Sequence, residues 1–254
     1  MLDINKFTEK IGSAWMKYLQ PFFESKEAWD IYQELKQVSK TEIITPKSEQ
    51  TWRFLKEIDP ENVKIIIIAL DGFPGRYNKT LLHADGIPFS NEFSPDGKLQ
   101  PSLISFWEGI SQEFDENLPQ VGDLKWLLQQ GVFLGNAALT LKLFKTGSQL
   151  QLWEPFWKYF FRYYVETRPD IPIILLGQEA KKLKKYVTFN KIFELSHPSF
   201  NARNGTIWET KGVFKNCNKI IEGLNGKEYV IEWNYEKYNK RNAQSSNIED
   251  NVPF

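Results

Sequence analysis

Short apolar runs and amphipathic segments alternate along most of this chain. Four runs rich in branched apolar residues predict buried strands: "NVKIIIIAL" (62–70), "VFLGNAAL" (132–139), "IPIILLG" (171–177) and "KIFELSHP" (191–198). Apolar residues spaced three or four positions apart predict helices at 102–114, 123–130, 152–167 and 178–187. A further helical pattern covers residues 13–40, and we expect Pro21 to interrupt it.

Strands that alternate with helices predict a single α/β domain with a central, mostly parallel four-stranded sheet flanked by helices. Right-handed crossover connections then bring the carboxyl ends of all four strands to one edge of the sheet. We expect this domain to span residues 1–232. From residue 233 to residue 254 polar residues dominate, which predicts a flexible polar tail.

Polar side chains stand at the carboxyl ends of three predicted strands. Asp71 follows the first strand, Asn136 ends the second and His197 follows the fourth. Each has an ordinary structural explanation when taken alone, such as a turn, a cap or a satisfied histidine before proline. Open α/β sheets bind ligands in the crevice outside these strand ends, however. A carboxylate, a carboxamide and an imidazole that converge there favour a functional site.

Composition narrows the range of functions. The chain has 254 residues with 32 basic and 32 acidic side chains, so binding to nucleic acid needs a local basic face. The single cysteine, Cys217, excludes an intramolecular disulfide and fits a reducing cytoplasm. One cysteine and two histidines in the whole chain are too few for a metal cage of thiolates and imidazoles. We therefore expect no metal and no cofactor. No apolar run is long enough to span a bilayer, so we expect no membrane association.

Nine segments resemble, in the same order, motifs of the uracil-DNA glycosylase superfamily, closest to the type that excises uracil as a free base. The resemblance covers about residues 12–222 and implies that family's fold. It also implies a hydrolase that removes uracil from DNA during base-excision repair. The segments are "SAWMKYLQPFF", "ITPKSEQTWRFL", "IIIIALDGFPG", "ADGIPFS", "QPSLISFWEGI", "GDLKWLLQQGVFLGNAALTLK", "LWEPFW", "PIILLGQEAKK" and "SHPSF".

The resemblance assigns catalysis to Asp71 and His197. Such enzymes flip the target nucleotide out of the duplex before they cleave its glycosidic bond. The Asp71 carboxylate would orient a water molecule and stabilise the positive charge that develops on the sugar. A neutral His197 would donate a hydrogen bond to the departing base and stabilise its negative charge.

Four residues are expected to hold the base. The carboxamide of Asn136 offers a donor and an acceptor that match O4 and N3–H of uracil, whereas cytosine would face it with mismatched groups. By resemblance, Phe89 stacks on the base, Phe73 blocks its C5 position and the backbone N–H of Leu70 is a second donor to it. The expected base-binding residues are Leu70, Phe73, Phe89 and Asn136.

Contacts with the DNA backbone are also implied by the resemblance. Serines and backbone amides in short loops would hold the phosphates, and Phe200 would fill the space that the flipped base leaves. We expect the protein to act as a monomer on single- or double-stranded DNA. The expected DNA-binding residues are Pro46, Lys47, Ser48, Ser102, Gly177, Gln178, Ser199 and Phe200.

The water-activating motif departs from the family pattern. Gly72, Phe73 and Pro74 stand where the family usually has Pro, Tyr and His, and 17 residues separate Asp71 from Phe89. Gly72 would loosen this loop. Two alternatives therefore stay open: a glycosylase for another modified pyrimidine, and a catalytically weak relative that serves as a DNA-binding or interaction module. A nucleotide-binding α/β protein is disfavoured because the chain lacks a glycine-rich phosphate loop.

The segment Glu249–Phe254, "EDNVPF", resembles the acidic tip of bacterial single-stranded-DNA-binding proteins. In that family the tip recruits repair and replication enzymes. By resemblance, Phe254 would enter an apolar pocket on a partner, and Glu249 and Asp250 would lie along a basic rim. We expect this tip to dock the protein onto partners that recognise the single-stranded-DNA-binding protein.

Overall fold

A four-stranded parallel sheet forms the centre of the protein. The structure, a computed structural model, describes residues 2–249. The strand order is β3-β2-β5-β6, and each neighbouring pair is parallel. The expected α/β domain with its four-stranded sheet is therefore confirmed. The strands are β2 (Ile65–Asp71), β3 (Val132–Ala138), β5 (Ile173–Leu176) and β6 (Ile192–Leu195).

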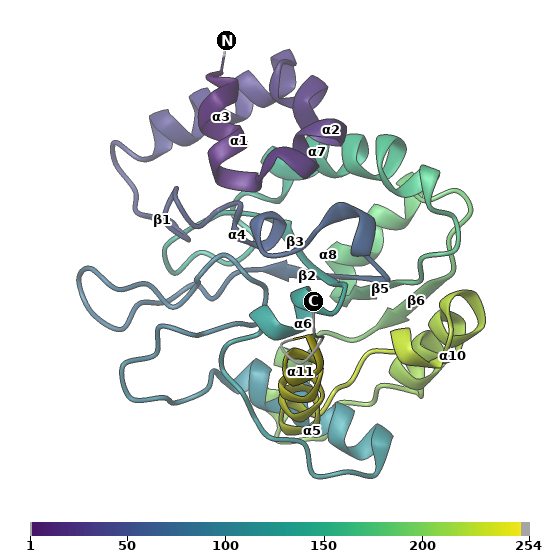
Figure 1. Ribbon diagram of the computed structural model, residues 1–254. Helices are drawn as coiled ribbons and strands as arrows, with labels where there is room; N and C mark the ends of the chain where they lie inside the picture. Colours follow the sequence, from purple (N-terminus) through teal and green to yellow (C-terminus); the bar gives the residue numbers. More distant parts are fainter. Residues whose placement is uncertain (1, 250–254) are drawn as a thin grey trace.

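Helices cover both faces of this sheet, as Figure 1 shows. On one side lie α1 (Ile4–Ile11), α2 (Ser13–Phe23), α3 (Lys26–Val38) and α7 (Leu150–Tyr163). On the other side lie α5 (Pro101–Phe114) and α10 (Val213–Asn225). The shorter helices are α4 (Arg53–Lys56), α6 (Lys125–Gln129), α8 (Gly177–Lys181) and α9 (Pro198–Asn204), with 3₁₀ turns η1 (Pro60–Asn62), η2 (Val165–Thr167), η3 (Lys182–Tyr186) and η4 (Lys227–Tyr229).

The sheet is buried because its strands are apolar on both faces. Residues 65–69 of β2 are at most 1% exposed. On β3, Phe133 packs against Trp15 of α2 and Phe160 of α7, with ring centroids 5.9 and 5.0 Å away. Burial of each such ring contributes about 1.5–3 kcal/mol to stability. The central strands therefore form a rigid support for the residues at their carboxyl ends.

A small second sheet was not predicted from the sequence. Strand β1 (Ile44–Thr45) pairs antiparallel with β4 (Leu141–Lys142). Each strand has only two residues, too short for a periodic pattern to reveal it. This pairing joins the loop after β1 to the turn after β4, and both segments border the site described below.

The N-terminal helical pattern breaks later than Pro21 predicted. Pro21 lies inside α2, which continues to Phe23. The break falls at Glu24 and Ser25, where the Ser25 hydroxyl accepts a hydrogen bond from the backbone N–H of Ala28 at 3.2 Å. The serine cap, which starts α3, therefore sets the boundary.

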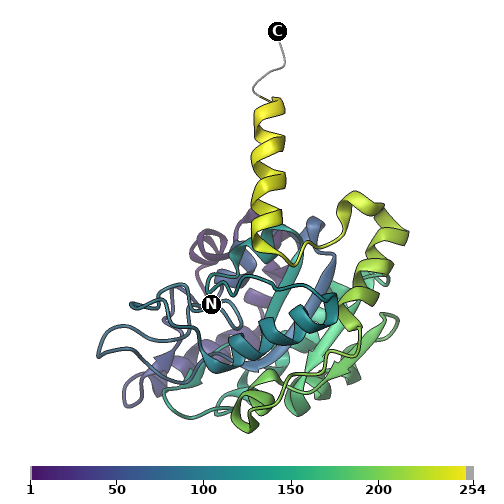
Figure 2. The ribbon, with the colours of Figure 1, turned by 90° about the horizontal axis from the view of Figure 1, so that it is seen from below.

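The expected flexible tail is helical over α11 (Tyr235–Glu249). The Asn234 side chain caps this helix by accepting hydrogen bonds from the backbone N–H groups of the second and third following residues, at 3.0 and 3.2 Å. Tyr235 and Tyr238 pack on Trp126, which anchors the first turn. Figure 2 shows the rest of α11 projecting away from the domain. Residues 250–254 of the expected docking tip lie outside the described residues.

Neither a membrane-spanning helix nor a metal-binding cluster is present among the described residues. No helix within residues 2–249 is both long and apolar enough to cross a membrane. In the same part of the chain, no three histidine, cysteine or acidic side chains come together in a way that would hold a metal ion.

Candidate active site

Asn136 lies within strand β3 rather than at its end. It pairs with Ala69 of β2, and only 8% of it is exposed. The indole N–H of Trp157 donates to the backbone carbonyl oxygens of Asn136 and Ala137, at 3.1 and 3.0 Å. The position of the Asn136 backbone is thus fixed from the sheet and from α7. Its side-chain Oδ1 is buried and has no hydrogen-bond partner among the described residues.

Asp71 is the last residue of β2 and shares a sheet face with Asn136. Asn136 pairs with Ala69, two residues before Asp71, and side chains two positions apart on a strand point to the same face. The Asp71 Oδ2 atom accepts a hydrogen bond from the backbone N–H of Gly147 at 2.6 Å. Burial raises the pKa of this carboxyl to about 6, although the Gly147 bond opposes the shift. Asp71 is therefore mostly ionised at neutral pH, with one oxygen anchored.

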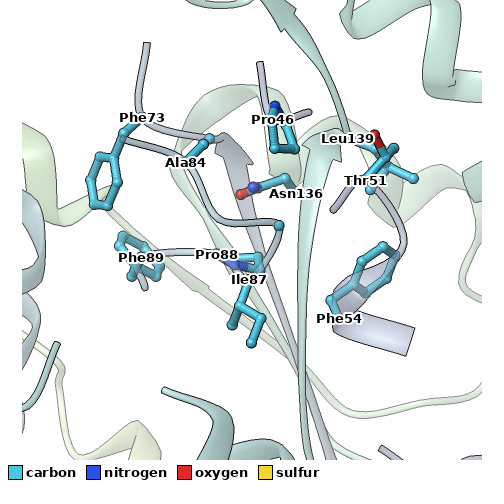
Figure 3. A pocket seen from close by; sticks show the side chains of 12 residues that line it. Pro46, Thr51, Phe54, Phe73, Ala84, Ile87, Pro88, Phe89, Asn136 and Leu139 are labelled. Atoms are coloured by element: carbon cyan, nitrogen blue, oxygen red, sulfur yellow. The ribbon is translucent and has the colours of Figure 1, made fainter. Parts of the chain in front are cut away.

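A small pocket opens beside these strand ends. Figure 3 shows the Asn136 carboxamide reaching into it, with Phe73, Ala84 and Phe89 on one side and Thr51 and Leu139 on the other. The wall is mostly apolar, so a polar group at its floor is costly unless a ligand pairs with it. The lining residues are Pro46, Thr51, Phe54, Gly72, Phe73, Ala84, Gly86, Ile87, Pro88, Phe89, Asn136 and Leu139.

Phe89 is held in place by stacking and by a buried carboxylate. Its ring stacks on Phe106 of α5 at 5.3 Å, and its backbone has a left-handed φ of 64°. The fully buried Asp85 accepts hydrogen bonds from the backbone N–H of Ile87 at 3.0 Å and from the Ser90 hydroxyl at 2.5 Å. These bonds close the loop that carries Phe89. Sequence reasoning missed Asp85, although the Asp-Gly pair in "ADGIPFS" is a turn signal.

His197 sits against Phe89 and caps helix α9. The two ring centroids are 5.4 Å apart. The His197 Nδ1 atom accepts the backbone N–H of Ser199 at 3.1 Å, so in the neutral ring the proton is assigned to Nε2. Burial lowers the pKa of this imidazole to about 4, and the nearby positive charge of Arg203 adds to the effect. His197 is therefore a neutral hydrogen-bond donor at physiological pH.

The structure brings together only part of the predicted base-binding set. Phe73, Phe89 and Asn136 line the pocket, and Pro46 of the expected DNA contacts joins them. Asp71 precedes the lining residue Gly72, and His197 contacts Phe89. Leu70 does not line the pocket. Sequence reasoning missed several lining residues, chiefly Thr51, Phe54, Ile87 and Leu139, because none of these side chains differs in kind from an ordinary buried residue.

The expected DNA contacts differ in exposure. Lys47, Ser48 and Gln178 are exposed, while Gly177 and Ser199 are half-buried. Phe200 is 56% exposed at the first turn of α9. Ser102 is only 8% exposed, so it is less accessible to DNA than the exposed residues of this set. Close packing explains the glycine before Gln178, because a Cβ at Gly177 would come within 3.0 Å of the His197 Cβ.

The residues added after Asp71 form an ordered hairpin. The N–H of His83 donates to the carbonyl of Gly75 at 3.0 Å, and the N–H of Tyr77 donates to the carbonyl of Leu81 at 2.8 Å. The ring of His83 packs on Tyr77 with centroids 4.3 Å apart. His83 lies outside the pocket lining, whereas its neighbour Ala84 belongs to it.

The loop from Gly72 to Gly75 is held by a hydrogen bond and by close packing, contrary to the expectation that Gly72 would loosen it. The N–H of Phe144 donates to the carbonyl of Pro74 at 2.7 Å. A Cβ at Gly72 would lie 3.0 Å from the Cβ of Ala84, and a Cβ at Gly75 would lie 2.6 Å from Nδ1 of His83. A side chain at either position would therefore press on the hairpin, because the hairpin packs closely on the loop.

The chain belongs to the uracil DNA glycosylase superfamily. The model of this family matches residues 55–222, a stretch that includes the pocket residues Gly72, Phe89 and Asn136 and both Asp71 and His197. The resemblance expected from the sequence is confirmed.

Curated and solved relatives agree with this family. A uracil-DNA glycosylase of Bacillus anthracis (strain CDC 684 / NRRL 3495) is 30% identical over 227 residues, covering 88% of this chain and 96% of the relative. One of Bacillus cereus (strain AH187) is 29% identical over the same coverage. The crystal structure of mimivirus uracil-DNA glycosylase superposes with a TM-score of 0.75 at 20% identity, covering 91% of this chain and 92% of the mimivirus chain. The expected enzyme class, an N-glycosylase, is thus confirmed.

Proposed function

We propose that this protein hydrolyses the N-glycosidic bond of uracil in DNA, as a step of base-excision repair. The observation that carries the proposal is the Asn136 carboxamide, whose Oδ1 is buried and unpartnered at the floor of an apolar pocket. A buried polar atom of this kind costs about 1–3 kcal/mol unless a ligand satisfies it. Uracil offers N3–H to Oδ1 and O4 to the amide N–H, and so satisfies both ends.

The same carboxamide explains rejection of cytosine. Cytosine presents an amino group where uracil has O4 and an unprotonated N3 where uracil has N3–H, so each contact becomes a mismatch. Sites that leave buried polar groups unpaired with the wrong substrate discriminate by large factors. Phe73 on the pocket wall supports exclusion of a methyl group at C5, which would separate uracil from thymine.

Bond cleavage would use Asp71 and His197 on opposite parts of the substrate. The nucleotide is first flipped out of the stack so that the base enters the pocket. One Asp71 oxygen is held by Gly147, and the other can orient the attacking water and face the positive charge on the sugar. Nε2–H of His197 would donate to O2 of uracil as negative charge builds on the departing base.

DNA would lie across exposed and half-buried residues around the pocket. Lys47, Ser48 and Ser199 would hold phosphates, and Phe200 would occupy the gap that the flipped base leaves. This placement needs no net positive charge on the protein, because the basic and hydroxyl groups are local.

A substrate panel tests the proposal. Single-stranded oligonucleotides with one uracil, cytosine, thymine or 5-substituted uracil are incubated with the protein, and abasic sites are then cleaved and counted on a gel. We expect cleavage at uracil only. Cleavage confined to a 5-substituted base would favour the other modified-pyrimidine activity, and no cleavage of any strand would favour a DNA-binding module.

The variant Asn136→Asp tests the reading residue within the same assay. In the orientation that pairs with uracil, the amide N–H of Asn136 would face the amino group of cytosine, whereas a carboxyl oxygen at this place can accept from that amino group. We expect the ratio of uracil to cytosine cleavage to fall. An unchanged ratio would remove Asn136 from base recognition.

A further inference from the structure

An aromatic side chain lies exposed beside the pocket in an unusual backbone conformation. Phe144, in the turn after β4, is 65% exposed and has a left-handed φ of 64°. For a bulky residue this conformation costs on the order of 1 kcal/mol and marks positions that the surrounding structure holds in place. The Phe144 ring belongs to no part of the hydrophobic core among the described residues. Core packing therefore does not explain why a phenylalanine stands here.

The turn that carries Phe144 is hydrogen-bonded to two places, the loop from Gly72 to Gly75 and the side chain of Asp71 just before it. The N–H of Phe144 donates to the carbonyl of Pro74 at 2.7 Å, and Pro74 follows the pocket residue Phe73. Three residues further on, Gly147 donates to the Asp71 carboxylate. The backbone that carries the exposed ring is thus held in place relative to both the pocket wall and Asp71.

A basic side chain of the hairpin described above lies against the Phe144 ring. The Arg76 guanidinium lies 6.0 Å from the ring centroid of Phe144, within the range of a cation–π contact. Residues 72–84 and 139–149 together hold four basic side chains and no acidic one, in a chain whose net charge is zero. Glu42 pairs with one of them, Lys145, at 2.7 Å. The others are Arg76, Lys79 and Lys142.

We propose that Phe144 and Arg76 form a stacking platform for an unpaired nucleobase next to the flipped nucleotide in single-stranded DNA. This inference rests on the proposed function, because the adjacent nucleotide is the one expected to flip, but stacking of an unpaired base on the ring does not itself need a base in the pocket. Exposed aromatic rings with adjacent basic groups bind single strands through base stacking and phosphate attraction. In a duplex the neighbouring bases are paired and stacked on each other, so the platform gives single-stranded substrates an advantage.

Binding of single strands tests the platform without requiring base excision. A fluorescein-labelled thymidine 12-mer is titrated with the full-length protein, and the dissociation constant is read from fluorescence anisotropy. We expect Phe144→Ala to weaken binding about tenfold and Phe144→Trp to retain it. Phe189→Ala is the matched control, since Phe189 is 71% exposed and precedes β6 at the opposite edge of the sheet. Equal affinity of Phe144→Ala and the wild type would overturn the platform.

Arg76→Gln separates the ionic part of the platform from stacking. Loss of one phosphate contact on a single strand lowers the salt dependence of log K by about 0.7. We expect this change for Arg76→Gln, whereas Phe144→Ala should weaken binding at an unchanged salt slope. An unchanged slope for Arg76→Gln would remove Arg76 from the platform.

An abasic neighbour identifies the stacked base. Uracil strands that lack the base on the 5′ or the 3′ side are compared by kcat/KM for the wild type and Phe144→Ala. The loss caused by Phe144→Ala should disappear on the strand that lacks the stacked base. An equal loss on every strand would contradict stacking. If the wild type releases no uracil, the proposed function fails, while the thymidine 12-mer still decides the platform.

Discussion

Asn136 at the floor of the pocket and Phe73 at its mouth are held by different kinds of structure. Asn136 belongs to a buried parallel strand, and the Trp157 indole fixes its carbonyl from a second direction. Phe73 lies in a loop held by single hydrogen bonds and by close contacts at Gly72 and Gly75.

This difference separates the groups assigned to bond cleavage and to reading N3 and O4 of uracil, which lie on strands or just after them, from the groups expected to set selectivity at C5. Groups on the strands have one position, set by a continuous ladder of hydrogen bonds and by core packing. Groups on the loop depend on a few local contacts, each of which one substitution can change. We expect changes at the strand ends to remove activity, and changes at the mouth to alter which strand or base is accepted.

The largest effect is expected for Asp71→Asn. Asparagine keeps the acceptor for Gly147 but has no negative charge to orient water or stabilise the sugar cation. We expect kcat for uracil release to fall by about 10²–10⁴ in single-turnover assays. Retention of near-wild-type turnover would show that Asp71 does not have this role.

The same substitution should stabilise the fold. Because folding raises the pKa of the Asp71 carboxyl to about 6, the native state holds this proton more tightly than the unfolded state. This group therefore favours folding below about pH 4, and the contribution is lost as the pH rises through 6. At pH 7, Asp71→Asn should raise the free energy of unfolding by about 1–2 kcal/mol in urea denaturation. A less stable variant would contradict the assigned burial.

The pH dependence of activity should follow Asp71 alone between pH 5 and 8. Below about pH 6 its carboxylate becomes protonated, so kcat/KM should fall about tenfold per pH unit. His197, with a pKa near 4, stays neutral over this range and adds no second limb. Rates measured on single-stranded uracil DNA from pH 4.5 to 8 check this. A midpoint near 4 would assign the limb to another group.

Phe200→Ala should distinguish duplex from single-stranded substrates. An exposed apolar ring at the start of α9 can fill the gap in a duplex, whereas a single strand has no base pair to open. We expect kcat/KM to fall about tenfold on duplex uracil DNA and to change little on single strands. Phe189→Ala is again the control. Equal losses on both substrates would refute a wedge.

The smallest effect is expected for Gly75→Ala at the mouth. The added Cβ would lie 2.6 Å from His83 Nδ1, so the His83 ring must move, and we expect this to disturb the hairpin and the neighbouring Phe73. We expect uracil turnover to fall only a few-fold, while the preference for uracil over thymine weakens. Gly223→Ala is the control, because a Cβ there meets nothing within 4 Å. Unchanged selectivity would separate the hairpin from the C5 wall.

Long segments with one clear period were predicted well from the sequence. The four strands, α5, α6 and α7 were found within a few residues, because apolar runs and helical spacing depend on burial alone. Short elements, the 13-residue helix α10 and the helix α11 were not found. Two-residue strands have no period, and the sequence of α11 is mostly polar, with Tyr235 and Tyr238 packed on Trp126.

The sequence by itself determined the parallel sheet and the strands that carry Asp71 and Asn136, since both follow from local patterns. It also determined the family, through motifs in a fixed order. Only the tertiary structure decided that Gly147 binds Asp71 and that Phe144 lies beside the pocket. These contacts join residues from separate segments. They depend on how loops close over the sheet, and the periodicity of one segment carries no information about its distant partners.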